Sequence, residues 1–321
     1  MKKTIHVILS LALFLSVSSL SIAADLSGKK ILFIDSYHEG YAWSDGITEG
    51  INSAVSSSGV KLKIVRMDTK RNGSDEFKNE AALKAKAVIE TFKPDVVIAA
   101  DDNASKFLVM QYYKNADLPF VFCGVNWDAT GYGYPYKNTT GMVEVTPVPQ
   151  LIEQLTPFAK GTKIGFLAPD HLTSKKENDN FKKIFGLETT TFFAKDYTDW
   201  KKGFMELQEK TDMVIIDTDG GLYKDNAADM KSFIESNTKK PTGTSYDFMA
   251  PYALICFAKI AQEQGIWSGE AALKILSGTA PADIPIVKNK EGQLIINVRI
   301  AKALDVEIPF EILESAARII E

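Results

Sequence analysis

The alternation of short apolar runs with amphipathic helical patterns is the feature that most constrains how this chain folds. Four apolar runs alternate with helical patterns between Lys29 and Phe122, and a second set of the same kind begins near residue 146. This alternation is typical of βαβ units, which place a mostly parallel sheet between layers of helices. The expected strands are 31–34, 62–65, 96–99, 120–122, 163–167, 188–193 and 213–216, and the expected helices are 44–57, 74–92, one opening at Asn103, one opening at 146–147, 174–185, 198–209 and 225–236.

A Gly- and Tyr-rich segment, residues 126–140, interrupts this pattern between the two sets. One doubly wound sheet needs no interruption of this length, whereas two lobes joined by extended segments do. We therefore predict an α/β fold of two doubly wound parallel-sheet lobes joined by a hinge of crossing segments. The expected first lobe is 25–143 plus about 247–283, and the second is 144–246 plus about 284–321. The crossings are expected at 141–145 and near 243–247, and the later chain is expected to form helices over 248–264, 268–276 and 308–320 and strands over 284–287 and 294–298.

Residues 1–24 have the pattern of a secretory signal peptide. Lys2 and Lys3 precede an apolar core from Val7 to Val17, and small residues at 21–24 offer a cleavage site. The core is too short to span a bilayer, and no cysteine near the cleavage site provides for a lipid anchor. We therefore expect an exported, periplasmic protein that is soluble.

The net charge of the chain argues against two classes of partner. The formal net charge is −4, and it falls to about −6 once the two lysines of the signal segment are removed. A mildly acidic chain without a basic run argues against nucleic acid and anionic membrane surfaces as partners.

Cys123 and Cys256 stand in apolar surroundings far apart in the sequence, so we expect two buried free thiols rather than a disulfide.

An aromatic loop, residues 36–43, follows the first expected strand. In open parallel sheets the carboxyl ends of the strands are where small ligands bind. Two tyrosines, a histidine and a tryptophan within seven residues suit a surface that lies flat against a ligand ring or a facing lobe. We interpret the loop as part of a binding site, with one of its rings packing the first helix onto the sheet.

Several short motifs, taken in order, resemble one family. They are SYHEGYAW at 36–43, DDNA at 101–104, VFCGVN at 121–126, TGMVE at 140–144, FMAPYA at 248–253 and ADIPIV at 282–287. The chain is similar along nearly all of its mature length to ABC-transporter substrate-binding proteins with the type I periplasmic binding protein fold, a group related to extracellular sensor regions of bacterial receptors. The resemblance implies two α/β lobes, three crossing segments and a ligand in the cleft between them.

In this architecture, the loops at the carboxyl ends of the strands of both lobes point toward the cleft. The expected ligand-binding residues of the first lobe are Ser36, Tyr37, His38, Tyr41, Trp43, Asp101, Asp102, Asn103, Asn126 and Trp127. Those of the second lobe are Asp170, His171, Asp217, Asp219, Tyr246 and Asp247.

Asp101, Asp102 and Asn103 form the sharpest polar group. One acid and Asn103 together suit the start of a helix, but two adjacent carboxylates repel each other unless one accepts from a ligand donor such as an ammonium or a hydroxyl. A carboxylate on the ligand would be bound either by Arg66, which stands at a strand end, or by backbone N–H groups and hydroxyls. The tyrosines of 132–136 are candidates for the cleft mouth, with at least one expected to pack against the hinge.

Motifs of common enzymes are missing from the sequence. There is no His-x-x-x-His or Cys-x-x-Cys spacing, no Gly-x-Ser-x-Gly, no phosphate-binding Gly-x-x-x-x-Gly-Lys-Ser/Thr and no Gly-x-Gly-x-x-Gly. We therefore expect a binding protein rather than an enzyme, with no cofactor and no metal, acting as a monomer. The expected ligand is of amino-acid size and contains a ring: an aromatic amino acid, a nucleoside or a sugar-like molecule. Delivery to an ABC permease in the membrane is the leading hypothesis, docking on a membrane signalling receptor is the alternative, and a cleft hydrolase comes last.

Overall fold

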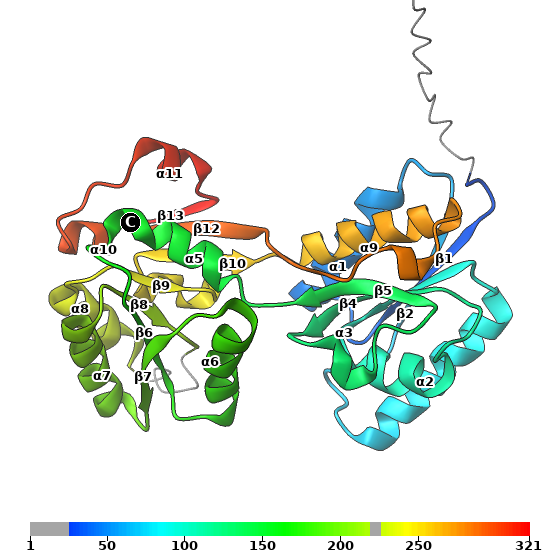
Figure 1. Ribbon diagram of the computed structural model, residues 1–321, viewed down its shortest axis with the longest axis horizontal. Helices are drawn as coiled ribbons and strands as arrows, with labels where there is room; N and C mark the ends of the chain where they lie inside the picture. Colours follow the sequence, from blue (N-terminus) through cyan, green and yellow to red (C-terminus); the bar gives the residue numbers. More distant parts are fainter. Residues whose placement is uncertain (1–25, 219–225) are drawn as a thin grey trace, which may run out of the picture.

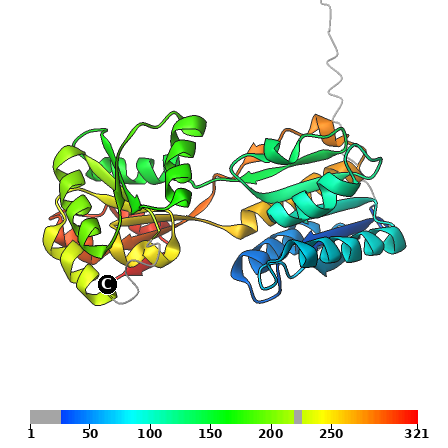
Figure 2. The ribbon, with the colours of Figure 1, turned by 90° about the horizontal axis from the view of Figure 1, so that it is seen from below.

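The computed structural model describes residues 26–218 and 226–321. The expected signal peptide at 1–24 and the expected site residue Asp219 lie outside these residues. Two lobes stand side by side and are joined by three extended segments, as Figures 1 and 2 show from perpendicular directions. Each lobe has its own sheet with helices packed on it, so the predicted α/β fold of two doubly wound lobes is confirmed.

The first lobe is built on a six-stranded parallel sheet in the order β11-β5-β4-β3-β1-β2. Its strands are β1 (Lys30–Asp35), β2 (Lys61–Arg66), β3 (Val96–Ala100), β4 (Phe120–Asn126), β5 (Thr139–Glu144) and β11 (Val287–Lys288). Its helices are α1 (Ala42–Val55), α2 (Asp75–Phe92), α3 (Asp101–Asn103), α4 (Met110–Tyr112) and α9 (Ala261–Leu276), with a π-helical segment η1 (Ala104–Val109) and short 3₁₀ turns η2 (Ala129–Tyr132) and η5 (Pro281–Asp283).

The strands β1 and β3 are buried on both faces, which is why their sequences are continuous apolar runs. Helices α1 and α9 cover one face and contact each other along small residues: a Cβ at Gly265 of α9 would lie 2.1 Å from the carbonyl oxygen of Ile47 in α1. Helix α2 and segment η1 cover the other face. The aromatic segment supplies core as well, because Tyr134 and Tyr136 are buried and Tyr134 stacks on Phe122 with 4.3 Å between ring centroids.

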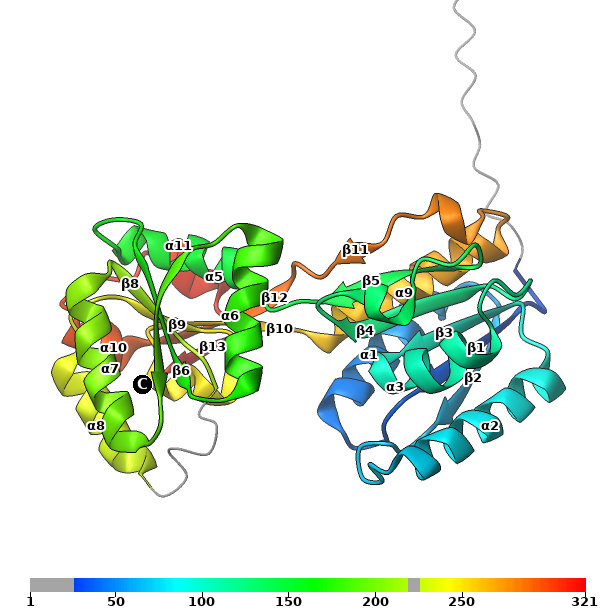
Figure 3. The same ribbon diagram turned by 60° about the horizontal axis from the view of Figure 1, so that its bottom comes forward.

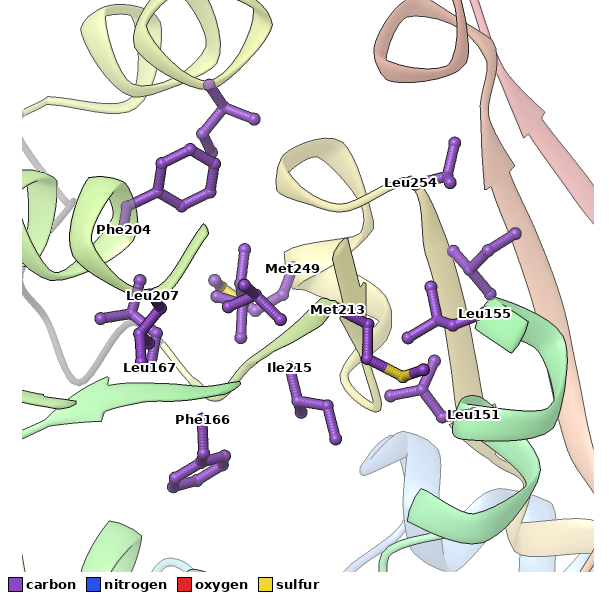
Figure 4. Close-up of a cluster of buried hydrophobic side chains, with 14 of the residues drawn as sticks. Leu151, Leu155, Phe166, Leu167, Phe204, Leu207, Met213, Ile215, Met249 and Leu254 are labelled. Atoms are coloured by element: carbon purple, nitrogen blue, oxygen red, sulfur yellow. The ribbon is translucent and has the colours of Figure 1, made fainter. Parts of the chain in front are cut away.

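The second lobe is built on a seven-stranded sheet in the order β13-β12-β10-β9-β8-β6-β7, in which only the β10–β12 pairing is antiparallel among the described strands. Its strands are β6 (Ile164–Pro169), β7 (Thr189–Ala194), β8 (Met213–Ile216), β9 (Thr242–Thr244), β10 (Ile255–Lys259), β12 (Gly292–Asn297) and β13 (Arg318–Ile320). Its helices are α5 (Val148–Leu155), α6 (Leu172–Phe185), α7 (Tyr197–Lys210), α8 (Ala227–Asn237), α10 (Val298–Ala303) and α11 (Phe310–Ser315), with 3₁₀ turns η3 (Thr156–Phe158) and η4 (Asp247–Tyr252). Figure 4 shows part of its core, where side chains of α5, β6, α7, β8 and η4 meet: Leu151, Leu155, Phe166, Leu167, Phe204, Leu207, Met213, Ile215 and Met249.

The expected path of the chain between 243 and 264 is wrong. We predicted a crossing near 243–247 and a helix over 248–264, but β9 and β10 both belong to the second sheet and the chain crosses only after Lys259. Pro251 lies in the short turn η4, and the apolar run that follows is buried between β9 and β12. A short apolar run buried on both sides has no periodicity that separates strand from helix, which is the source of the error.

The tail of the chain also differs from the prediction. Residues 287–288 pair with β5 and so extend the first sheet, although 284–321 was assigned to the second lobe. Figure 3 shows β11 at the edge of the first lobe, from which the chain passes to β12. The helix expected over 308–320 is short: α11 ends at Ser315, and β13 pairs with β12. Three segments therefore cross between the lobes, after β5, after β10 and after β11.

Both cysteines are buried and free, as predicted. In residues 26–218 and 226–321, no helix is long and apolar enough to cross a membrane.

Candidate ligand-binding site

A cavity of about 270 Å³ lies where the first lobe meets the crossing segments, and we call it the first-lobe cavity. The segments that follow β1, β2 and β3 supply most of its wall, and the ends of β4, β5 and β10 supply the rest. These are carboxyl ends of strands, where small ligands bind in open parallel sheets; we call this expectation the parallel-sheet rule. Its lining residues are Tyr37, Tyr41, Trp43, Lys70, Asp101, Asn126, Glu144 and Lys259.

Three aromatic rings of the 36–43 loop form one wall of this cavity. Tyr37 and Tyr41 meet edge to face with 5.4 Å between ring centroids, and the ammonium of Lys70 lies about 5 Å from both centroids. The indole N–H of Trp43 donates to Oδ1 of Asp101 at 3.0 Å. Half-buried rings held in this way offer a flat apolar surface with a cation and a carboxylate beside it.

Asp101 is the most unusual residue of the site. Its side chain is buried, its backbone has a φ of 69°, and its Oδ2 has no hydrogen-bond partner among the described residues. Burial, Glu144 and Asp35 together raise the pKa of this carboxyl well above its ordinary value. A buried carboxylate oxygen without a partner is costly, and a ligand donor would relieve that cost.

Asp102 has a different role from its neighbour. Its Oδ1 accepts from the hydroxyl of Tyr132 at 2.9 Å, and its Oδ2 accepts from the amide of Asn126 at 2.7 Å. Asn103 donates to Thr69 Oγ1 at 2.9 Å and does not cap a helix, because the helical segment begins two residues earlier, at Asp101. The three adjacent polar residues therefore separate into one that faces the cavity and two that tie loops together.

Two further candidate residues, Ser36 and Arg66, already have partners within the first lobe. Ser36 is fully buried: its hydroxyl donates to the carbonyl of Ala100 at 2.6 Å and accepts from the N–H of Ala104 at 2.8 Å. Arg66 forms an ion pair with buried Asp35, with 2.6 Å between Nη1 and Oδ2. A ligand carboxylate would have to displace Asp35 to use this guanidinium, so Arg66 is a poor candidate for that role.

A second cavity of about 400 Å³ spans the two lobes, and we call it the inter-lobe cavity. Trp127, from the loop after β4, extends to helix α6 of the other lobe, where its N–H donates to Oε2 of Glu177 at 3.0 Å and its ring lies 6.1 Å from that of Phe181. Burial raises the pKa of Glu177 to about 7, although Thr146 hydrogen-bonds its other oxygen. The lining residues of this cavity are Asn126, Trp127, Glu144, Thr146, Thr173, Lys176, Glu177, Asn180, Tyr246 and Lys259.

Glu144 and Lys259 line both cavities and form an ion pair with each other. Glu144 ends β5 and Lys259 ends β10, so the pair links two of the three crossings. Burial raises the pKa of the Glu144 carboxyl, and Lys259 partly offsets this effect. Sequence reasoning missed both residues, although Glu144 stands at a strand end where the parallel-sheet rule could have found it.

The remaining expected residues fall into two groups. Tyr246 lines the inter-lobe cavity and hydrogen-bonds to Asp217, which is buried and also bonds Ser174. The other group does not line either cavity in the described part of the chain; it consists of His38, Asp170, His171 and Asp247. Asp170 is exposed and pairs with Lys175 at 2.5 Å, and Nδ1 of His38 lies 2.9 Å from the carbonyl oxygen of Glu39.

Sequence reasoning also missed Lys70, Thr146, Thr173, Lys176, Glu177 and Asn180. Lys70 stands in a loop beyond β2, and Glu177 is one turn into a helix, so neither carries a motif that marks it in the sequence. Within 26–218 and 226–321, no group of three or more His, Cys, Asp or Glu side chains is arranged to hold a metal ion.

Comparison with known proteins places this architecture in a family. A family model described as ABC transporter substrate binding protein matches residues 39–320. The chain belongs to the ABC transporter substrate-binding protein family. Members of this family act outside the cytoplasm and are binding proteins rather than enzymes.

Three relatives of this substrate-binding chain are informative. A protein of Clostridioides difficile (strain R20291) named tyrosine-binding protein is 23% identical over 251 residues, which are 74% of this chain and 70% of that protein. The ligand-free, open structure of a substrate-binding protein with adhesive properties from Clostridium difficile superposes with a TM-score of 0.68 at 21% identity, covering 91% of this chain and 99% of that one. The structure of an ABC domain from Streptococcus pneumonia in complex with L-Trp gives a TM-score of 0.50 at 22% identity and covers 92% of this chain and 100% of that one.

Proposed function

We propose that this protein captures an aromatic amino acid between its lobes and delivers it to an ABC permease. The observation that carries the proposal is the first-lobe cavity, where the rings of Tyr37, Tyr41 and Trp43 stand beside the buried Oδ2 of Asp101, an atom without a partner in the described part of the chain. Rings suit an aromatic side chain, and the carboxylate suits an ammonium.

The charges of this cavity match a zwitterion. Asp101 and Glu144 are the two acids in its wall, and Lys70 and Lys259 are the two cations. Lys259 already pairs with Glu144, whereas Lys70 has no ion-pair partner among the described side chains and lies over the two tyrosine rings. Lys70 is therefore the residue that we assign to the ligand carboxylate, in place of Arg66.

Two relatives support this choice among ring-containing ligands. One is named for tyrosine, and the other was solved with L-Trp, whereas a sugar or a nucleoside would leave the opposed charges of the cavity without partners. The volume of about 270 Å³, with the inter-lobe cavity of about 400 Å³ beside it, accommodates a molecule of this size.

The family supports transport as the role of binding. We propose that residues 1–24 direct export to the periplasm and are removed, and that the lobes close on the ligand by bending at the three crossings before docking on the permease.

A thermal-shift screen followed by titration calorimetry tests the ligand assignment. We expect L-tyrosine, L-tryptophan or L-phenylalanine to raise the unfolding midpoint with one site per chain. Tyramine, which lacks the carboxylate, and 3-(4-hydroxyphenyl)propionate, which lacks the ammonium, serve as matched controls and should bind far more weakly. Preferential binding of ribose, adenosine or a similar uncharged molecule would overturn the proposal.

A further inference from the structure

Asn289 occupies the point where the third crossing leaves the first lobe. Strand β11 pairs in parallel with β5 up to Lys288, and the N–H of Asn289 then donates to the carbonyl of Val143 at 3.3 Å. At Val145, two residues after Val143 and just beyond the end of β5, the side chain of Asn289 replaces its backbone as the hydrogen-bond partner. Oδ1 of Asn289 accepts from the N–H of Val145 at 2.6 Å, and Nδ2 donates to the carbonyl of Val145 at 3.1 Å.

This exchange lets the main chain of the third crossing turn away without losing hydrogen bonds. The carboxylate of Glu263, on helix α9, accepts from the N–H groups of Lys290 and Glu291, each at 2.9 Å. Asn289 is 4% exposed and Val145 is 2% exposed, so without this side chain the backbone N–H and carbonyl of Val145 would be buried with no hydrogen-bond partner among the described residues. The first and third crossings are therefore held together by one buried side chain.

The first crossing is in turn linked to the second. Glu144, which directly precedes Val145, pairs with Lys259 at the start of the second crossing. Asn289, Glu144 and Lys259 thus connect all three crossings at one level of the hinge. Asn289 lies outside the lining of both cavities among the described residues, whereas Glu144 and Lys259 line them.

We propose that Asn289 is a positioning residue of the hinge. By fixing Val145 it holds Glu144 in the walls of both cavities and restricts the range of angles that the two lobes adopt in the ligand-free protein. It acts on ligand affinity through this preorganisation and not by contact with the ligand, and this second part rests on the proposed function.

Spin labels on the two lobes measure the range of angles directly. Lys84 of α2 and Lys202 of α7 are exposed and lie on different lobes, and both native cysteines are buried, so Lys84→Cys and Lys202→Cys give selective labelling sites. The distance distribution between the labels is recorded without ligand in the unaltered hinge, in Asn289→Ala and in Asn138→Ala. Asn138 is the matched control, because it is also 4% exposed and donates to backbone carbonyls, at Tyr113 and Leu118, within the first lobe.

We expect Asn289→Ala to broaden the distance distribution and to weaken binding of L-tyrosine about ten-fold, as loss of preorganisation does. Asn138→Ala should lower the unfolding midpoint and leave the distribution unchanged. If Asn289→Ala does not fold, Asn289→Asp keeps the acceptor for Val145 N–H, loses the donor, and should give an intermediate broadening. A distribution in Asn289→Ala or Asn289→Asp as narrow as that of Asn138→Ala overturns the proposal. Because this arm uses no ligand, it remains decisive even if no amino acid binds.

Discussion

Replacement of Asp101 by asparagine separates the binding role of this residue from its cost to the fold. Asparagine has the same shape, tolerates the φ of 69° at this position, and keeps an oxygen that accepts from the indole N–H of Trp43. The change removes the negative charge and puts an NH2 donor in place of Oδ2, the acceptor oxygen that has no partner among the described residues. A hydrogen bond between a carboxylate and an ammonium contributes about 1.5–3 kcal/mol, so binding of an aromatic amino acid should weaken roughly 10- to 100-fold.

The same substitution should stabilise the ligand-free protein at neutral pH. Burial raises the pKa of Asp101 in the folded state above its ordinary value near 3.9 in the unfolded chain, so ionisation of this carboxyl costs stability. The protonated carboxyl therefore stabilises the fold at low pH, and that stabilisation is lost as the pH rises. Asp101→Asn does not titrate, so its advantage over the original protein should be absent near pH 4 and grow toward pH 8.

Calorimetry with L-tyrosine or L-tryptophan measures the affinity, and thermal unfolding without ligand at pH 4 and pH 8 measures the stability. Asp102→Asn is the matched control, because both oxygens of Asp102 are bound by Asn126 and Tyr132. It should lower the unfolding midpoint and reduce affinity less than Asp101→Asn does. Unchanged affinity in Asp101→Asn, or a larger loss in Asp102→Asn, would refute the assignment of Asp101 to the ligand ammonium.

Two further predictions concern the inter-lobe contact and the core. Burial raises the pKa of Glu177 to about 7, so this carboxyl stabilises the fold most below its ordinary pKa near 4.5, and the stabilisation is lost as the pH rises through 7. Glu177→Gln does not titrate, so the urea midpoint of this variant should fall less between pH 5 and pH 8 than that of the original protein. An equal fall in both proteins would contradict this prediction. Gly265→Ala should cost about 1–3 kcal/mol or more in the free energy of unfolding, because its Cβ would meet the carbonyl oxygen of Ile47 at 2.1 Å. Gly73→Ala, where a Cβ meets none of the described atoms within 4 Å, is its control and should be neutral in the same denaturant titration.

The inner strands β1 and β3 of the first lobe could be predicted from sequence because burial on both faces leaves a continuous apolar run. Val96–Ala100 is apolar throughout and is bounded by helical patterns on both sides. The same signature failed for Ile255–Lys259, because the apolar residues before and after it continue the run and conceal the strand within a longer segment. The local hydrophobic pattern therefore predicts helices and strands that are separated by polar turns. It fails to locate a strand where the segments on either side of that strand are apolar too.

The site could be predicted only in part, because tertiary pairing decides which polar groups remain available. Adjacent acids such as Asp101 and Asp102 are equivalent in sequence, and the positive φ of Asp101 is what directs the two side chains to different surroundings. Glu144 and Lys259 are 115 positions apart, and their pairing depends on two crossings that meet only in the folded chain. The aromatic loop was predictable because its composition alone is unusual for a solvated turn.

Small-angle scattering of the unaltered protein tests the central claim most directly, since that claim is closure of two lobes around a ligand. Profiles are compared without ligand and at saturation with the amino acid that calorimetry ranks tightest. The account predicts a smaller radius of gyration and a shorter maximum dimension at saturation, as bending at the three crossings brings the lobes together. Identical profiles at proven saturation would contradict it.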